Sequence, residues 1–135
     1  MRNETGTHWM VVDDDTDTLQ VVTRLLAAVS GAEIHSFPSP SQALDALAAT
    51  PEAYQLVVTD YEMPGMNGLD FRRQIETVSP TTKVLLTTGS GKFTDESARE
   101  NGFCGLLCKP FSAEALKQTL ARVIACPFSS PSATN

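Results

Sequence analysis

The chain of 135 residues has the length of one domain, which buries enough surface on folding to need neither a disulfide nor a structural metal. Ten Lys and Arg against sixteen Asp and Glu give a formal net charge of −6, which argues against a nucleic-acid-binding surface because such surfaces are basic. No apolar run approaches the roughly 18 residues that cross a bilayer, and the first residues lack the apolar core of a secretory signal. An odd number of Cys is typical of free thiols in the cytoplasm.

Short apolar runs alternate with amphipathic stretches along most of the chain. The runs are typical of buried parallel strands, except that the one at 33–37 alternates apolar and polar residues as an edge strand does. The stretches between them have apolar residues at helical spacing, and the more polar segment at 93–101 is expected to be helical as well. In chain order the sequence predicts a strand at 9–12, a helix at 19–29, a strand at 33–37, a helix at 43–47, a strand at 56–59, a helix at 69–75, a strand at 84–87, a helix at 93–101, a strand at 103–108 and a helix at 115–124.

Capping residues support several of these boundaries. Ser39 is a candidate N-cap, and Pro40 after it suits the first helical position. Ser112 is a candidate cap for the last helix. The pair Asn101-Gly102 is suited to ending the helix before it, because glycine readily adopts the left-handed conformation found there.

Five strands that alternate with five helices indicate a single doubly wound α/β domain with a five-stranded parallel sheet. We expect a disordered N-terminal segment at 1–7, the folded domain at 8–126, and a flexible tail rich in Ser and Pro at 127–135. In sheets of this kind the working site lies at the carboxyl ends of the strands. Those ends are therefore the place to look for chemistry.

Charged residues collect at the predicted strand ends. The first strand runs into Asp13 and Asp14, the third ends at Asp60, and Lys109 follows the fifth. Two carboxylates about 4 Å apart repel by about 4 kcal/mol at an effective dielectric of 20, so a cation must offset the cost. Carboxylate oxygens with free water positions suit Mg²⁺. Together with a threonine hydroxyl at the end of the fourth strand, this set suits phosphoryl transfer.

Two other acidic motifs fit the sequence poorly. A calcium-binding EF-hand loop that starts at Asp13 needs Gly at its sixth position and Glu at its twelfth, where this chain has Thr18 and Arg24. A phosphatase of the haloacid dehalogenase type has an Asp-x-Asp-x-Thr pattern after its first strand. The Thr position holds Asp17 when counted from Asp13 and Leu19 when counted from Asp15.

Four segments in order resemble the receiver domain of two-component response regulators, over about residues 8–125. The segments are MVVDDD at 10–15, VVTDYEMPGMNGLD at 57–70, VLLTTG at 84–89 and LLCKPF at 106–111. Each would be weak alone, but each lies at a predicted strand end. The resemblance implies a flavodoxin-like fold of the receiver type.

The resemblance also implies a phosphorylation site with bound Mg²⁺. Asp60 corresponds to the phosphoacceptor. Asp14 and Asp60 would bind the ion directly, Asp13 through water, and the backbone carbonyl of Glu62 would complete the protein ligands.

Phosphoryl oxygens would be bound by Lys109 and by the hydroxyl of Thr88, the threonine that a small residue follows, whereas Thr87 is interpreted as a buried strand residue. One position departs from the family pattern. Many receivers have Tyr or Phe three residues before the lysine as part of the switch, and this chain has Leu106. The aromatic switch is therefore in question, while the phosphorylation site is complete.

The function implied is that of a signalling domain, not of an enzyme in its own right. A histidine kinase or a histidine phosphotransfer protein would donate the phosphoryl group, and the altered surface would act on a downstream protein target in the cytoplasm, without binding nucleic acid or membrane. No output domain follows in this sequence, and the same motifs resemble receivers fused to hybrid histidine kinases, so a stand-alone and an excised domain both remain open. The alternative function is a receiver-like scaffold that binds partners without phosphorylation.

Four further side chains are able to bind metals. The two histidines, His8 and His35, are interpreted as surface residues without partners. Cys104 and Cys108 face the same way on the last predicted strand, and we interpret them as buried thiols in preference to a metal-binding pair.

Overall fold

The structure is a computed structural model that describes residues 7–51, 53–89 and 91–125. The expectations for 1–6 and 126–135 lie outside the described residues. Strands and helices alternate as predicted. The elements are β1 (His8–Val12), α1 (Thr16–Val29), β2 (Glu33–Phe37), α2 (Pro40–Ala49), β3 (Tyr54–Asp60), α3 (Gly68–Val78), β4 (Lys83–Thr88), α4 (Asp95–Glu100), β5 (Gly105–Cys108) and α5 (Ala113–Ala125).

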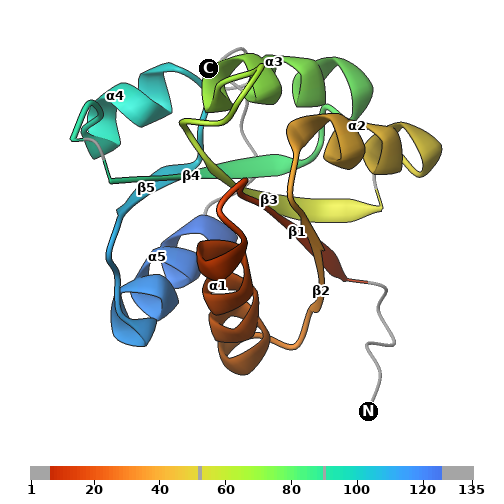
Figure 1. Ribbon diagram of the computed structural model, residues 1–135. Coiled ribbons are helices and arrows are strands. Elements are labelled where there is room, and N and C mark those ends of the chain that lie inside the picture. The colour runs from red at the N-terminus through yellow and green to blue at the C-terminus, as the bar shows by residue number, and fades with distance from the viewer. Residues whose placement is uncertain (1–6, 52, 90, 126–135) are drawn as a thin grey trace.

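The five strands form one parallel sheet in the order β2-β1-β3-β4-β5. Helices α2, α3 and α4 cover one face, and α1 and α5 cover the other (Figure 1). This is the predicted doubly wound arrangement, and β2 is an edge strand as its alternating pattern indicated. In the described part of the chain, no helix is long and apolar enough to cross a membrane.

Each face of the sheet has its own hydrophobic core, because successive strand residues point to opposite faces. Along β1, Met10 and Val12 pack in the core under α2, α3 and α4, whereas Val11 packs in the core under α1 and α5. Phe71 of α3 and Leu26 of α1 are fully buried anchors of these two cores. Buried strands of this kind fix the positions of the residues that follow them.

The predicted caps are present in the structure. The Ser39 hydroxyl accepts the Gln42 N–H, and the Ser112 hydroxyl accepts the Ala115 N–H at 3.1 Å. Asn101 ends α4, and Gly102 has a φ of 94°, in the left-handed region that glycine tolerates.

Two boundaries near α4 differ from the prediction. The helix begins at Asp95 with Thr94 as its cap, and not at residue 93. Strand β5 begins at Gly105, two residues later than expected, because the Phe103 N–H bonds back to the Ala98 carbonyl and closes the helix. The backbone of Phe103 thus ends α4, and its apolar side chain packs in the core beside that helix.

Candidate functional site

The predicted charged residues meet at the carboxyl end of the sheet. Asp13 and Asp14 follow β1, Asp60 ends β3, and Lys109 follows β5. Because β1 and β3 are neighbours in the sheet, their carboxylates lie side by side. Asp13 is 2% exposed and Asp60 is 9% exposed, while Asp14 lies at the surface.

Lys109 is the counter-ion of the buried carboxylates. Its Nζ lies 3.0 Å from Asp13 Oδ2 and 3.1 Å from Asp60 Oδ1. The other oxygen of Asp13 accepts the N–H of Asp15 at 2.9 Å, so the carboxylate of Asp13 is held on both sides. The ammonium and the two carboxylates come from three strand ends that are far apart in the chain, and only the fold brings them together.

The surroundings shift the proton affinities of this pair. Burial raises the pKa of Asp60, and the hydrogen bond from Lys109 offsets that shift only in part. Burial alone would lower the pKa of Lys109, but the hydrogen bonds to Asp13 and Asp60 outweigh it and the net pKa is raised. Lys109 is therefore a firmly held cation, and Asp60 is a carboxylate whose charge is costly in this place.

The donor set fits a hard divalent cation. One carboxylate oxygen from each of Asp13, Asp14 and Asp60 lies within 4.8 Å of the others. Three hard oxygen donors with an exposed side at Asp14 leave room for the water ligands that Mg²⁺ retains. This cluster is consistent with the Mg²⁺ site of a receiver domain.

Two threonines end β4, and both are buried, with 2% of the surface of each exposed. The Thr87 hydroxyl donates to the Thr59 carbonyl on β3 at 3.3 Å, so Thr87 is the buried strand residue that was expected. Thr88 is the last residue of the strand, and its carbonyl accepts the N–H of Lys109 at 2.9 Å. The backbones that carry Thr88 and Lys109 are therefore tied together, and the role of the Thr88 hydroxyl stays a prediction.

The loop after β3 contacts the loop after β4, which the sequence did not indicate. Glu62 forms an ion pair of 3.3 Å with Lys92, and the Lys92 ammonium lies 5.8 Å from the centroid of the Tyr61 ring. The Tyr61 ring meets the Phe93 ring edge to face at 4.9 Å. The order of residues in the two loops has no pattern that predicts these contacts. The ion pair with Lys92 involves only the side chain of Glu62, and the role of its backbone carbonyl at the metal stays a prediction.

Gly68 lies against the backbone of Asp60. Its N–H donates to the Tyr61 carbonyl at 2.7 Å, and a Cβ at this position would approach the Asp60 carbonyl oxygen to 2.8 Å. The start of α3 therefore packs directly against the backbone of Asp60, and the distance between the two backbones is too short for any residue with a Cβ at position 68.

Gly68→Ala is expected to lower the free energy of unfolding by about 2 kcal/mol, because backbone atoms must move to admit the methyl group. Urea unfolding measures the change. Gly31→Ala is the matched control: a Cβ there meets nothing within 4 Å, so its effect should stay within about 0.5 kcal/mol. Equal urea midpoints for the two variants would contradict the steric argument.

The histidines were expected to lack partners and the cysteines to be buried, and both expectations were wrong. His8 and His35 both face Glu33, at 3.7 and 3.2 Å, because the register of β1 and β2 brings the three residues together. Cys104 is only partly buried and Cys108 is exposed, since β5 is short and lies at the sheet edge.

Leu106 occupies the position at which many receivers have an aromatic residue. It is partly buried and packs against the core under α2, α3 and α4. The side chain therefore belongs to the apolar interior of that face and presents no polar tip to solvent.

Comparisons with known proteins agree with this geometry. A family model described as "Response regulator receiver domain" matches residues 9–121. The chain is 33% identical over 113 residues to the C4-dicarboxylate transport transcriptional regulatory protein DctD of Rhizobium meliloti, and 32% identical over 117 residues to the sensory/regulatory protein RpfC of Xanthomonas campestris. Each match covers 83% of this chain but only 24% of DctD and 16% of RpfC. A solved receiver domain protein from Clostridium thermocellum has a TM-score of 0.78 at 28% identity, over 88% of this chain and 94% of that one.

Proposed function

The chain belongs to the response regulator receiver domain family, and we propose that it accepts a phosphoryl group on Asp60 in a two-component phosphorelay, with Mg²⁺ as cofactor. The observation that carries the proposal is the bridge of Lys109 between Asp13 and Asp60, beside three carboxylates within 4.8 Å of one another. A lysine held at this point supplies a fixed positive charge where a phosphoryl group would sit.

The transfer itself needs one nucleophile and one leaving group. An Asp60 carboxylate oxygen attacks the phosphorus, an acyl phosphate bond forms, and the bond from phosphorus to the donor breaks. The donor atom, an imidazole nitrogen of a phosphohistidine or an oxygen of acetyl phosphate, keeps the electron pair. Lys109 and the Thr88 hydroxyl bind the phosphoryl oxygens, while the burial of Asp60 limits access of water.

The metal would be held by the residues predicted from the resemblance. Asp14 and Asp60 would be its direct carboxylate ligands, Asp13 would act through water, and Glu62 would contribute its backbone carbonyl. When bound, Mg²⁺ neutralises charge on the phosphoryl oxygens and offsets the repulsion among the carboxylates. The compact donor set of Asp13, Asp14 and Asp60 supports this assignment.

Phosphorylation would redistribute the contacts of Lys109. A phosphoryl group adds a charge of about −1.5 to −2 and three strong acceptors, which compete with Asp13 for the ammonium. The Lys109 backbone is tied to Thr88, so a shift at one is felt at the end of β4. To take a two-state surface from 1:99 to 99:1, the phosphoryl group must favour one state by about 5.5 kcal/mol.

The partners follow from the chemistry. The donor is a histidine kinase or a histidine phosphotransfer protein, and the output is contact with a protein target in the cytoplasm. The acidic balance of the chain argues against nucleic acid as the direct target. The competing function is a scaffold that binds partners without phosphorylation. The ion pairs of Lys109 with both Asp13 and Asp60 argue against a scaffold, because such a function does not need them.

Acetyl phosphate with Mg²⁺ is expected to add one phosphoryl group to the full chain, as seen by intact mass spectrometry. Removing the divalent ion with EDTA should reduce the uptake by at least about tenfold, because the carboxylates then repel the anionic donor. If neither acetyl phosphate nor a histidine kinase adds phosphoryl mass in the presence of Mg²⁺, the phosphoacceptor function fails and the scaffold function is favoured.

A further inference from the structure

A second cluster of potential metal ligands lies at the opposite end of the sheet from the acidic site. His8 begins β1, Glu33 begins β2, and His35 follows on the same strand. His8 and Glu33 are direct partners in the parallel register, and His35 is two residues further along the same face. At about 3.3 Å per residue along the strands, His8 lies about 16 Å from Asp13, and His35, which pairs with Met10, lies about 10 Å along the sheet from it, so the two sites are separate.

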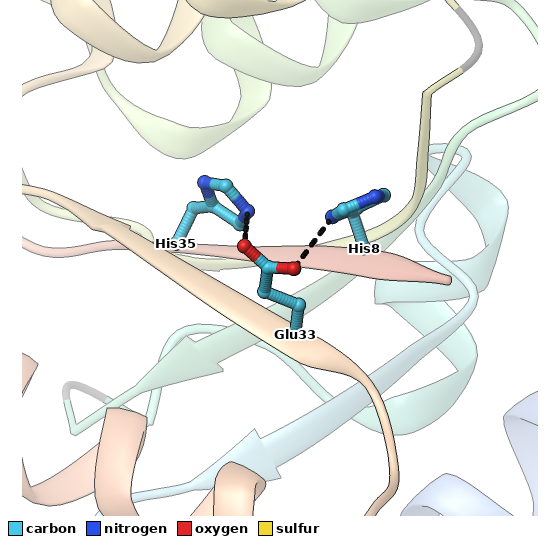
Figure 2. A group of neighbouring side chains, drawn as sticks. All are labelled: His8, Glu33 and His35. Atoms are coloured by element: carbon cyan, nitrogen blue, oxygen red, sulfur yellow. Dashed lines mark ion pairs between the residues drawn. The ribbon is translucent and has the colours of Figure 1, made fainter. Parts of the chain in front are cut away.

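The carboxylate of Glu33 lies between the two imidazole rings (Figure 2). Nδ1 of His8 is 3.7 Å from one of its oxygens, and Nε2 of His35 is 3.2 Å from the other. One ligand atom from each of the three residues lies within 4.8 Å of the others. Two imidazole nitrogens and a carboxylate oxygen thus converge on one point between two strands.

The two nitrogens that point at Glu33 are buried and have no hydrogen-bond partner. Buried polar atoms are normally satisfied, and an exception calls for an explanation. Around a tetrahedral ion with bonds of about 2.0–2.2 Å, neighbouring ligand atoms are about 3.4 Å apart. The separations of 3.7 and 3.2 Å run to the two different oxygens of Glu33, so the spacing of a set with one ligand atom from each residue is bounded by the 4.8 Å within which those atoms lie. An ion between the three atoms would satisfy both nitrogens with small movements.

The neighbouring tyrosine holds the imidazoles in place. The Tyr54 ring meets the His35 ring edge to face at 5.3 Å and the His8 ring at 6.3 Å, and Tyr54 itself is buried. Glu33, in contrast, is more than half exposed, so ions and water reach the cluster from solution. The ligand set is therefore partly preorganised and open on one side.

We propose that His8, Glu33 and His35 bind a divalent transition-metal ion of the Zn²⁺ class, with solvent in the remaining coordination position. Imidazole nitrogens with one carboxylate suit Zn²⁺ and its neighbours, and do not suit Mg²⁺ or Ca²⁺, which take oxygen ligands. The ion would clamp the edge strand β2 to β1 at their first residues. The formal charge of −6 raises the local concentration of cations around such a site.

The metal-free alternative is a pair of contacts in which an imidazole N–H, on a neutral or a charged ring, is directed at the Glu33 carboxylate. If both rings are charged, this alternative carries a cost from the mutual repulsion of two imidazolium rings whose centroids are 5.4 Å apart. It would also leave both buried nitrogens without a hydrogen-bond partner in the geometry described. The metal-bound arrangement accounts for both observations.

The test uses the full chain labelled with ¹⁵N-histidine, in Mg²⁺-containing buffer so that the acidic site is occupied. The sequence contains two histidines, so every imidazole signal comes from the proposed site. On titration with Zn²⁺, we expect the Nδ1 signal of His8 and the Nε2 signal of His35 to shift together, with one apparent Kd. Zinc bound by the thiols alone would leave these signals unchanged.

Glu33→Gln keeps the size of the side chain and removes its charge, so it should raise the apparent Kd for Zn²⁺ by about tenfold or more. Glu114→Gln is the matched control, because it removes the same charge from an exposed glutamate at the start of α5. It should leave the Kd unchanged. Three results would overturn the proposal: imidazole signals that do not move in excess Zn²⁺, movement of one histidine only, or equal affinities for the two variants. The first two are read on the parent chain, so the test does not depend on the folding of a variant.

Discussion

Asp60→Asn is expected to gain no phosphoryl group from acetyl phosphate and Mg²⁺, under conditions in which the parent chain is phosphorylated. The amide has no anionic oxygen to attack phosphorus, and it cannot form an acyl phosphate. Asp13 is buried in contact with Lys109 and with the Asp15 N–H, so it is not free to replace the lost nucleophile. The loss should be complete by intact mass spectrometry and not a change in rate.

Asp70→Asn is the matched control for that experiment. It makes the same chemical change on an exposed residue in the first turn of α3, and it should leave the phosphoryl uptake equal to that of the parent. Treatment with hydroxylamine adds a second check, because it cleaves an acyl phosphate and spares a phosphoester on a hydroxyl group. Phosphoryl mass on Asp60→Asn, or mass on the parent that resists hydroxylamine, would contradict Asp60 as the acceptor.

Lys109→Ala is expected to lower the free energy of unfolding in EDTA by about 2–4 kcal/mol. The variant leaves two largely buried carboxylates without their cation, and breaking a buried ion pair costs about 3–5 kcal/mol. Solvent at the 23% exposed Lys109 side chain screens part of that loss. Protonating one carboxylate from an ordinary pKa near 3.9 costs about 4 kcal/mol at pH 7, which sets an upper bound.

Mg²⁺ should restore more stability to Lys109→Ala than to the parent, because the ion then replaces the positive charge that the variant lacks beside Asp13 and Asp60. Lys92→Ala is the control: it removes a lysine that is 60% exposed and pairs with an equally exposed Glu62, so its cost should stay below about 1 kcal/mol. Urea unfolding with and without Mg²⁺ measures all three proteins. If both lysine variants lose the same stability, Lys109 is not the counter-ion of a buried pair.

The order of the elements was predictable from the sequence because buried parallel strands leave a strong pattern. The continuous apolar run at 56–59 and the alternating run at 33–37 correctly distinguished a central strand from an edge strand. The ends of elements were less predictable. Phe103 is apolar, as buried strand residues are, but its N–H bonds to the end of α4. An apolar side chain alone does not show whether a residue belongs to a strand or to the end of a helix.

The acidic site was predictable because it lies at strand ends, where topology alone brings residues together. The contacts of Lys92 with Glu62 and Tyr61 were not, since they depend on the paths of two loops. The cluster of His8, Glu33 and His35 was not predicted, for another reason. Its members are 25 residues or more apart from one strand to the next, and only the register between β1 and β2 shows that they meet. The register of a parallel pair is set by the hydrophobic patterns of two strands that a long crossover separates, and no tight turn between β1 and β2 fixes it in advance.

The shortness of α4 has a consequence for how stability is distributed in the molecule. A helix of six residues is far below the length of about 12–15 at which helices begin to persist alone, so α4 depends on its caps and on the burial of Ala98. Its opening would expose little apolar surface, and its backbone amides should exchange with solvent at a lower free energy than those of β1 or β3. The sheet that holds Asp13 and Asp60 is a stiff frame by comparison. A rearrangement that starts at the strand ends should therefore displace α4 at a lower free-energy cost than strands β1 or β3.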